Sequence, residues 1–184
     1  MKLNKKRAIE SAKQIHAEFG GLSRAPVNVD RIARKLNITI RYEPMDNELS
    51  GMIFIKDGKP IIGINSLHNA NRKRFTLAHE IGHYRLHSAL VSQEVHLDTN
   101  FSGGLYRDLK SATGVDPIEV EANAFAAELL MPEHLIKEEV SKCDIDLLTD
   151  PFLDDEAEKY ITELADKFKV SSLAIQTRIV NLKK

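Results

Sequence analysis

The stretch Phe75-Thr-Leu-Ala-His79-Glu80-Ile-Gly-His83-Tyr-Arg-Leu-His87 contains the pattern H-E-x-x-H. On an α-helix, His79 and His83 lie four residues apart on one face, about 6 Å apart along the axis. Two imidazoles at that spacing can bind one zinc ion, whose bonds to nitrogen are about 2 Å long. Glu80 lies where a general base acting on a zinc-activated water belongs. The stretch therefore predicts a helix with two zinc ligands, His79 and His83, and one catalytic residue, Glu80.

The residues around this pattern favour a buried helix, since an H-E-x-x-H match alone also arises by chance. Its apolar flanking positions are Phe75, Leu77, Ala78, Ile81 and Leu86. His87 continues the row of His79 and His83, but its Cα lies about 12 Å along the axis from that of His79. That distance is too long for two ligands of one four-coordinate ion. We therefore expect His87 to support the ligands or the fold without binding the metal.

Composition limits the classes of protein to consider. The chain has 184 residues, enough for one domain or one domain with a small appendage. Its 26 basic and 27 acidic residues give a net charge of -1, so no overall attraction to nucleic acid or membrane is expected. No apolar run has the length of a membrane span or signal peptide. The single cysteine, Cys143, is typical of a reducing compartment, and we expect a cytoplasmic protein.

The order of apolar patterns in the first half of the chain predicts an α+β fold. Helices are expected at 4–19, 27–36 and 69–87, and strands at 38–42, 50–55 and 60–64. The Asp57-Gly58 turn between the last two strands is a strong hairpin signal. In zinc peptidases a strand beside the site often receives the substrate as an added strand, and this hairpin is a candidate for that role.

The segment 88–117 is polar and rich in glycine, and it is long for a connection without secondary structure. Such segments are often functional or mobile. It contains His96 and Tyr106, which together with His87 are candidates for stabilising an oxyanion during the reaction. Most loop tyrosines are simply solvated, so this is the weaker of the site hypotheses.

A further helix is expected at 117–131, and it offers two candidate carboxylates for the position of the third metal ligand. Glu121 shares a face with Glu128, seven residues on, and that face is expected to point to solvent. Glu119 shares a face with Asn123 and with small residues that allow a close approach to another helix. Glu119 is therefore the expected ligand, and Asn123 is expected to orient a ligand by a hydrogen bond. Three protein ligands leave the fourth position to water, as in catalytic zinc sites.

The C-terminal part begins with an acidic linker at 144–158. The spacing of apolar residues at 160–182 is typical of a helix–turn–helix. Such a unit can place its second helix in a DNA groove, where Gln176 and Arg178 would be the contacts. Few basic residues accompany them, so packing against the catalytic part is favoured and direct DNA binding is not expected. We divide the chain into a metallopeptidase domain at 1–143 and this C-terminal segment at 144–184.

These motifs together resemble the ImmA/IrrE family of zinc-dependent metallopeptidases. The resemblance is carried by the stretches Arg74–His83, Glu119–Pro132 and Lys169–Ser171 and covers essentially the whole chain. It implies a zincin-like core, in which a small, mainly antiparallel sheet packs on the H-E-x-x-H helix and on a second ligand helix. It also implies one Zn²⁺ per chain and cytosolic endopeptidase activity. Asn123 stands where thermolysin-like enzymes have an aspartate in the pattern E-x-x-x-D.

The resemblance further implies a protein substrate, namely a helix–turn–helix transcriptional repressor of a mobile element or a stress response. Two other functions remain open from the sequence. The chain could be a zinc-containing regulatory or interaction module with little peptidase activity. Alternatively, it could regulate transcription by binding DNA through residues 160–182.

Overall fold

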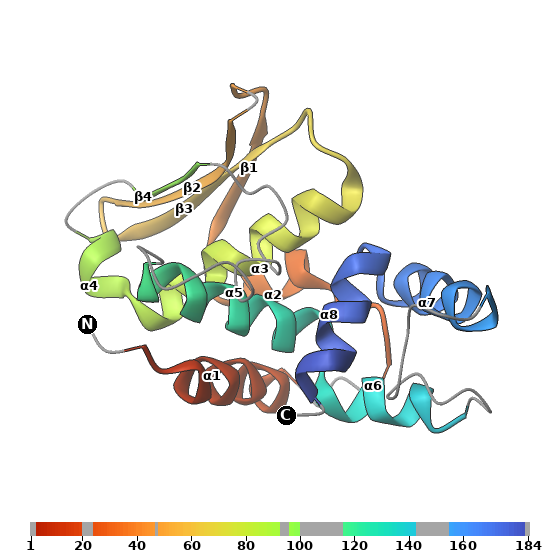
Figure 1. The fold of residues 1–184 in the computed structure, drawn as a ribbon. Coiled ribbons are helices and arrows are strands. Elements are labelled where there is room, and N and C mark those ends of the chain that lie inside the picture. Colours follow the sequence, from red (N-terminus) through yellow and green to blue (C-terminus); the bar gives the residue numbers. More distant parts are fainter. Residues whose placement is uncertain are drawn as a thin grey trace.

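The structure is a computed structural model that describes residues 3–19, 24–46, 48–92, 96–99, 116–142 and 155–182 (Figure 1). Its elements are α1 (Lys5–Glu18), α2 (Val29–Lys35), β1 (Thr39–Glu43), β2 (Leu49–Lys56), β3 (Lys59–Asn65), α3 (Ala70–Leu86), α4 (Ser88–Val91), β4 (His96–Thr99), α5 (Pro117–Leu130), α6 (Glu133–Val140), α7 (Asp155–Phe168) and α8 (Ser172–Leu182). The fold is α+β, as the sequence predicts. No helix in the described ranges is long and apolar enough to cross a membrane.

The strands of the described residues form a four-stranded sheet in the order β1-β3-β2-β4. β1 is parallel to β3, whereas β2 is antiparallel to both β3 and β4. The hairpin turn is confirmed, and its residues Asp57 and Gly58 have φ of 51° and 73°, as a two-residue turn of this hand requires.

The position of the hairpin in the sheet corrects one expectation. At Gly51, β2 is paired with β3 on one side and with β4 on the other. This part of the hairpin therefore cannot accept a further strand. The edge strand beside it is β4, which lies in the segment 88–117 that the sequence suggested to be a loop.

Helix α3 lies between the sheet and α5 (Figure 1). The sheet contributes buried isoleucines to the core, and α3 contributes Leu77 and Ile81. Where α3 meets α5, a Cβ added to Gly82 would lie 3.0 Å from Cδ1 of Phe125 and 3.2 Å from Cα of Ala122. The absence of a side chain at Gly82 thus allows the close approach of the two helices.

Several helices begin with a side-chain cap, which satisfies a backbone N–H that has no partner within the helix. Asn4 Oδ1 accepts from Arg7 N, Asn28 Oδ1 from Arg31 N, and Asp116 Oδ1 from Ile118 N. Pro117 follows Asp116 as the first helical residue of α5, where its missing N–H costs nothing.

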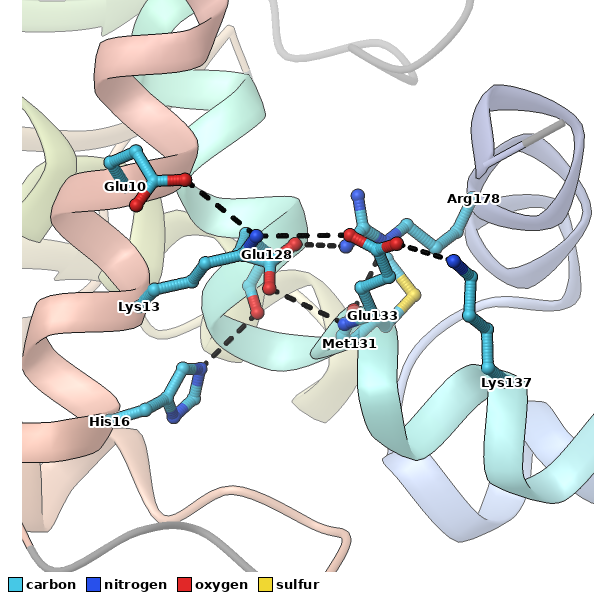
Figure 2. A network of polar contacts seen from close by, with 8 residues as sticks. All are labelled: Glu10, Lys13, His16, Glu128, Met131, Glu133, Lys137 and Arg178. Carbon is cyan, nitrogen blue, oxygen red and sulfur yellow. Dashed lines mark hydrogen bonds and ion pairs between the residues drawn. The ribbon is translucent and has the colours of Figure 1, made fainter. Parts of the chain in front are cut away.

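The C-terminal helix α8 is attached to α5 through Arg178 (Figure 2). This side chain is only 6% exposed, forms an ion pair with Glu128, and donates from Nε to the Met131 carbonyl at 3.0 Å. Glu128 also accepts a hydrogen bond from Glu133 N at 3.3 Å, and its own carbonyl lies 3.3 Å from His16 Nε2. The network therefore joins α1, α5, α6 and α8.

This arrangement corrects two further expectations. Glu121 and Glu128, expected to face solvent, are each 1% exposed, because α1 and α8 cover that face of α5. Arg178, expected as a contact to nucleic acid, is buried and paired inside the protein, and Gln176 is half-buried. The second helix of the helix–turn–helix pattern therefore does not offer its arginine to DNA.

Candidate metal centre

The two histidines of the H-E-x-x-H pattern lie on successive turns of α3 and face α5. They are 0% and 1% exposed, and the distance between His79 Nε2 and His83 Nε2 is 2.9 Å. The sheet on one side and α5 on the other keep solvent away from both rings. The two nitrogens are close enough to bind a single ion.

Glu119, in the first turn of α5, faces both histidines. Its Oε2 lies 3.3 Å from His79 Nε2, and its Oε1 lies 3.4 Å from His83 Nε2. Ligands at tetrahedral angles about 2.0–2.1 Å from zinc would be separated by about 3.3 Å. The spacing of His79, His83 and Glu119 fits such an ion, and these residues are one of the groups that could hold a metal.

Asn123, one turn after Glu119, orients the first histidine. Its Oδ1 lies 2.9 Å from Nδ1 of His79, which donates the hydrogen bond. With its proton on Nδ1, the imidazole presents the lone pair of Nε2 to the site. The structure thus brings Asn123 to the position that the sequence predicts for an orienting residue.

His87 and Glu121 form a separate buried pair at the end of α3. His87 Nε2 lies 3.1 Å from Glu121 Oε2, and Glu121 Oε1 accepts a hydrogen bond from the Asn4 backbone N–H at 2.7 Å. Burial lowers the pKa of His87, although Glu121 acts in the opposite direction. This pair connects α3, α5 and the start of α1, and it leaves His87 outside the group of ligand atoms.

His96, on β4, reaches the same carboxylate as the two histidines of α3. Its Nε2 lies 3.0 Å from Glu119 Oε1, and its ring centroid is 4.0 Å from that of His83. Its side chain is 28% exposed, so it lines the accessible side of the site. Tyr106, the other candidate for stabilising an oxyanion, lies outside the described residues.

Glu80 lies beside His79 and is 0% exposed. Neither carboxylate oxygen has a hydrogen-bond partner among the described residues. Burial raises the pKa of Glu80 well above its ordinary value, with further contributions from Asp98 and Glu119, although His79 acts in the opposite direction. The carboxylate is therefore a stronger base than one in water.

Asp98 is a site residue that the sequence reasoning missed. It is 4% exposed, and its ligand atom lies within 4.8 Å of those of His79 and Glu80. Burial raises its pKa, whereas His79 lowers it. The alternation His96-x-Asp98 could have revealed it, because side chains two apart on a strand point to the same face.

The charges of the site favour a cation. Burial lowers the pKa of His79, but the hydrogen bond to Glu119 and the charges of Glu80 and Asp98 outweigh it and raise the value to about 9. Burial and the neighbouring His79 lower the pKa of His83 to about 3. Without a metal, a proton on His79 thus provides the positive charge, and a bound metal ion would replace that proton.

Two comparisons with known proteins show what this chain is similar to. The family model described as IrrE N-terminal-like domain, Peptidase_M78, matches residues 33–180, which is most of the chain. The chain is also similar to "Uncharacterized immunity region protein 2" of Bacillus phage phi105. The two are 31% identical over 111 residues, which cover 60% of this chain and 63% of the phage protein.

Proposed function

This chain belongs to the ImmA/IrrE peptidase family, and from this premise we propose that it is a zinc-dependent endopeptidase. The observation that carries the proposal is the set of three donors, His79, His83 and Glu119, separated by 2.9–3.4 Å. Two nitrogens and one carboxylate oxygen are the ligands of many catalytic zinc sites. They would hold one ion per chain.

In this proposal Glu80 is the general base. When bound, zinc would polarise the scissile carbonyl and make a water molecule more acidic. Glu80 would take the proton of that water and pass it to the leaving amine. Its burial and the absence of a hydrogen-bond partner within the described ranges support this role, because both strengthen the base. Asn123 would hold His79 in the orientation that the ligand set needs.

His96 is the residue we propose for the developing oxyanion. It is partly exposed and lies beside Glu119, so its N–H can reach a group in the accessible side of the site. His87, the other candidate within the described residues, is engaged with Glu121. Donors directed at the position of the developing charge are a main source of rate enhancement.

We propose that the substrate binds as an added strand along β4. Among the described residues, β4 pairs with β2 on one side only, and it carries His96 and Asp98 towards the site. An extended peptide could use the other edge through backbone hydrogen bonds. The name of the phage relative supports a regulatory protein as the substrate. We propose a helix–turn–helix repressor as that protein.

Two measurements test this function. Elemental analysis should find about one zinc per wild-type chain and per Glu80→Gln chain. In competition with a chelator, Glu119→Ala should bind zinc at least about tenfold more weakly than the wild type. Glu121→Gln, two residues away on α5, is the matched control and should keep its zinc. The wild type should cleave a co-purified repressor, and Glu80→Gln should leave that repressor intact because it lacks the base.

The opposite results have definite meanings. A zinc affinity that is unchanged in Glu119→Ala would remove Glu119 from the ligand set. Cleavage by Glu80→Gln at the wild-type rate would remove Glu80 from its role. Zinc binding without cleavage of any bound repressor would favour a regulatory or interaction module over a peptidase.

A further inference from the structure

A second group of three side chains could hold a metal ion, and it overlaps the first. It consists of His79, Glu80 and Asp98, whose ligand atoms lie within 4.8 Å of one another. All three residues are buried, at 0%, 0% and 4% exposure. The function proposed above uses His79 as a ligand and Glu80 as a base, but it gives no role to Asp98.

The two carboxylates of this group lack partners. Among the described residues, neither oxygen of Glu80 nor Oδ2 of Asp98 has a hydrogen-bond partner. Burying an unpaired carboxylate is costly, and a nearby cation is one of the few arrangements that offset the cost. Such unsatisfied groups are rare in native proteins and indicate a bound group or a functional role.

The sheet leaves room for this group at Gly51. A Cβ added there would lie 2.5 Å from Cγ2 of Thr76 and 3.3 Å from Oε1 of Glu80. The register between β2 and β4 shifts between Leu49 and Gly51, so that Gly51 is the residue paired with Asp98. Such irregularities often redirect a side chain next to an active site. Here the missing side chain of Gly51 leaves space for the Glu80 carboxylate, and Asp98 is the residue of β4 that is paired with Gly51.

We propose that His79, Glu80 and Asp98 form an alternative position for a divalent cation. Nδ1 of His79 is engaged with Asn123, so Nε2 is the nitrogen available to both groups. An imidazole nitrogen has one lone pair, and the two positions therefore cannot be filled at the same time. One nitrogen and two carboxylates suit zinc and also suit harder ions such as Mn²⁺.

The alternative position has a consequence for activity that rests on the proposed function. A carboxylate bound to a cation cannot accept a proton, so an ion held by Glu80 and Asp98 would leave the enzyme without its base. The protein would then be latent until the ion occupied the position formed by His79, His83 and Glu119. The same chain would hold one ion in either an inactive or an active place.

Zinc affinity tests the proposal without any measurement of cleavage. The starting variant is His83→Ala/Glu119→Gln, which removes two donors of the first group and none of the second. Metal-free protein is titrated with zinc in competition with a chromophoric chelator. This variant should bind zinc, and adding Asp98→Asn should weaken the binding by at least about tenfold, since even supporting residues of metal sites contribute that much. Equal affinities with and without Asp98→Asn would overturn the proposal.

Two further variants serve as a control and as a second test. Leu97→Ala, at a neighbouring position of β4 that is 51% exposed, is the matched control and should leave the affinity unchanged. Glu80→Gln in the same background removes the other carboxylate and should weaken binding as Asp98→Asn does; an unchanged affinity would again overturn the proposal. Failure of the peptidase function would appear elsewhere, as an Asp98→Asn variant that lacks the alternative position, keeps its zinc and still does not cleave.

Discussion

The two ends of α5 hold two groups of buried charges that differ in how they are paired. At the far end, Glu128 is matched by Arg178 and by a backbone N–H, and α8 covers the pair. At the near end, where α5 carries Glu119, neither oxygen of Glu80 nor Oδ2 of Asp98 has a hydrogen-bond partner in the described part of the chain. A protein selected for stability alone would pair or remove such groups, and this difference supports our proposal that the unpaired end is the functional one.

The largest effect on stability is expected at the paired end. Arg178→Met keeps much of the volume of the side chain but leaves Glu128 buried without its cation. Removing one partner of a buried pair typically costs about 3–5 kcal/mol. Urea unfolding of the metal-free protein should therefore show Arg178→Met to be destabilised by about that amount.

A double variant distinguishes the lost pair from lost packing. In Glu128→Gln/Arg178→Met the uncompensated charge is gone, while the amide oxygen can still accept from Glu133 N. This protein should be more stable than Arg178→Met alone, because residue 128 is then a neutral glutamine and no unpaired charge is buried. If both variants are destabilised by the same amount, Arg178 stabilises the protein through packing and not through its charge. The contrast drawn between the paired end and the metal centre would then be wrong.

At the unpaired end of α5, removing a charge should increase the stability of the protein. Glu80→Gln replaces a buried carboxylate, which has no hydrogen-bond partner among the described residues, by a neutral amide of the same shape. We expect the metal-free variant to be more stable than the wild type by about 1–2 kcal/mol at neutral pH, at the expense of activity. Glu121→Gln is the control: its carboxylate is paired with His87, and its loss should destabilise the protein.

The stabilisation by Glu80→Gln should depend on pH. Burial raises the pKa of Glu80 well above the ordinary value of 4.5, so the folded wild type holds this proton more tightly than the unfolded chain. The wild type therefore loses stability as the pH rises above about 4.5 towards the pKa of the folded state. Unfolding experiments at pH 4 and pH 8 should show little advantage of the variant at pH 4 and a clear one at pH 8.

A smaller loss is expected at the sheet residue beside Glu80. A methyl group on Gly51 would meet Cγ2 of Thr76 at 2.5 Å, so β2 or α3 must shift. Overpacking of this kind costs about 1–3 kcal/mol. Thermal unfolding of Gly51→Ala measures it. In Gly58→Ala, the control in the same hairpin, the added methyl meets no atom within 4 Å, and the cost of a positive φ alone should be about 1 kcal/mol.

The sequence predicted the residues whose relation is local. His79 and His83 are one turn apart on α3, and Glu119 and Asn123 are one turn apart on α5, so helical periodicity was enough to group each pair. The Asp57-Gly58 turn is equally local. Asp98 was missed because a four-residue strand in a polar, glycine-rich segment gives almost no periodic signal.

The burial of charged residues could not be predicted from the sequence. Glu121 and Glu128 lie seven residues apart and form a charged stripe, which on an isolated helix predicts exposure. Whether such a stripe is covered depends on elements far away in the chain, here α1 and α8. For the same reason, Arg178 looked like a contact to DNA until its partner on α5 was known.

The smallest effect is expected from His16, which brings pH dependence to the paired end. Burial lowers the pKa of His16, although its hydrogen bond to the Glu128 carbonyl acts in the opposite direction. The unfolded chain therefore takes up this proton more readily than the folded protein, and stability should fall as the pH drops below about 6.5. One such proton contributes at most about 1.4 kcal/mol per pH unit. Denaturant unfolding of wild type and His16→Gln at pH 7 and pH 5 should give a smaller loss of stability for the variant. The same loss of stability in both proteins would show that the pH dependence arises from other groups. Protonation of His16 would then have no effect on the stability of the paired end of α5.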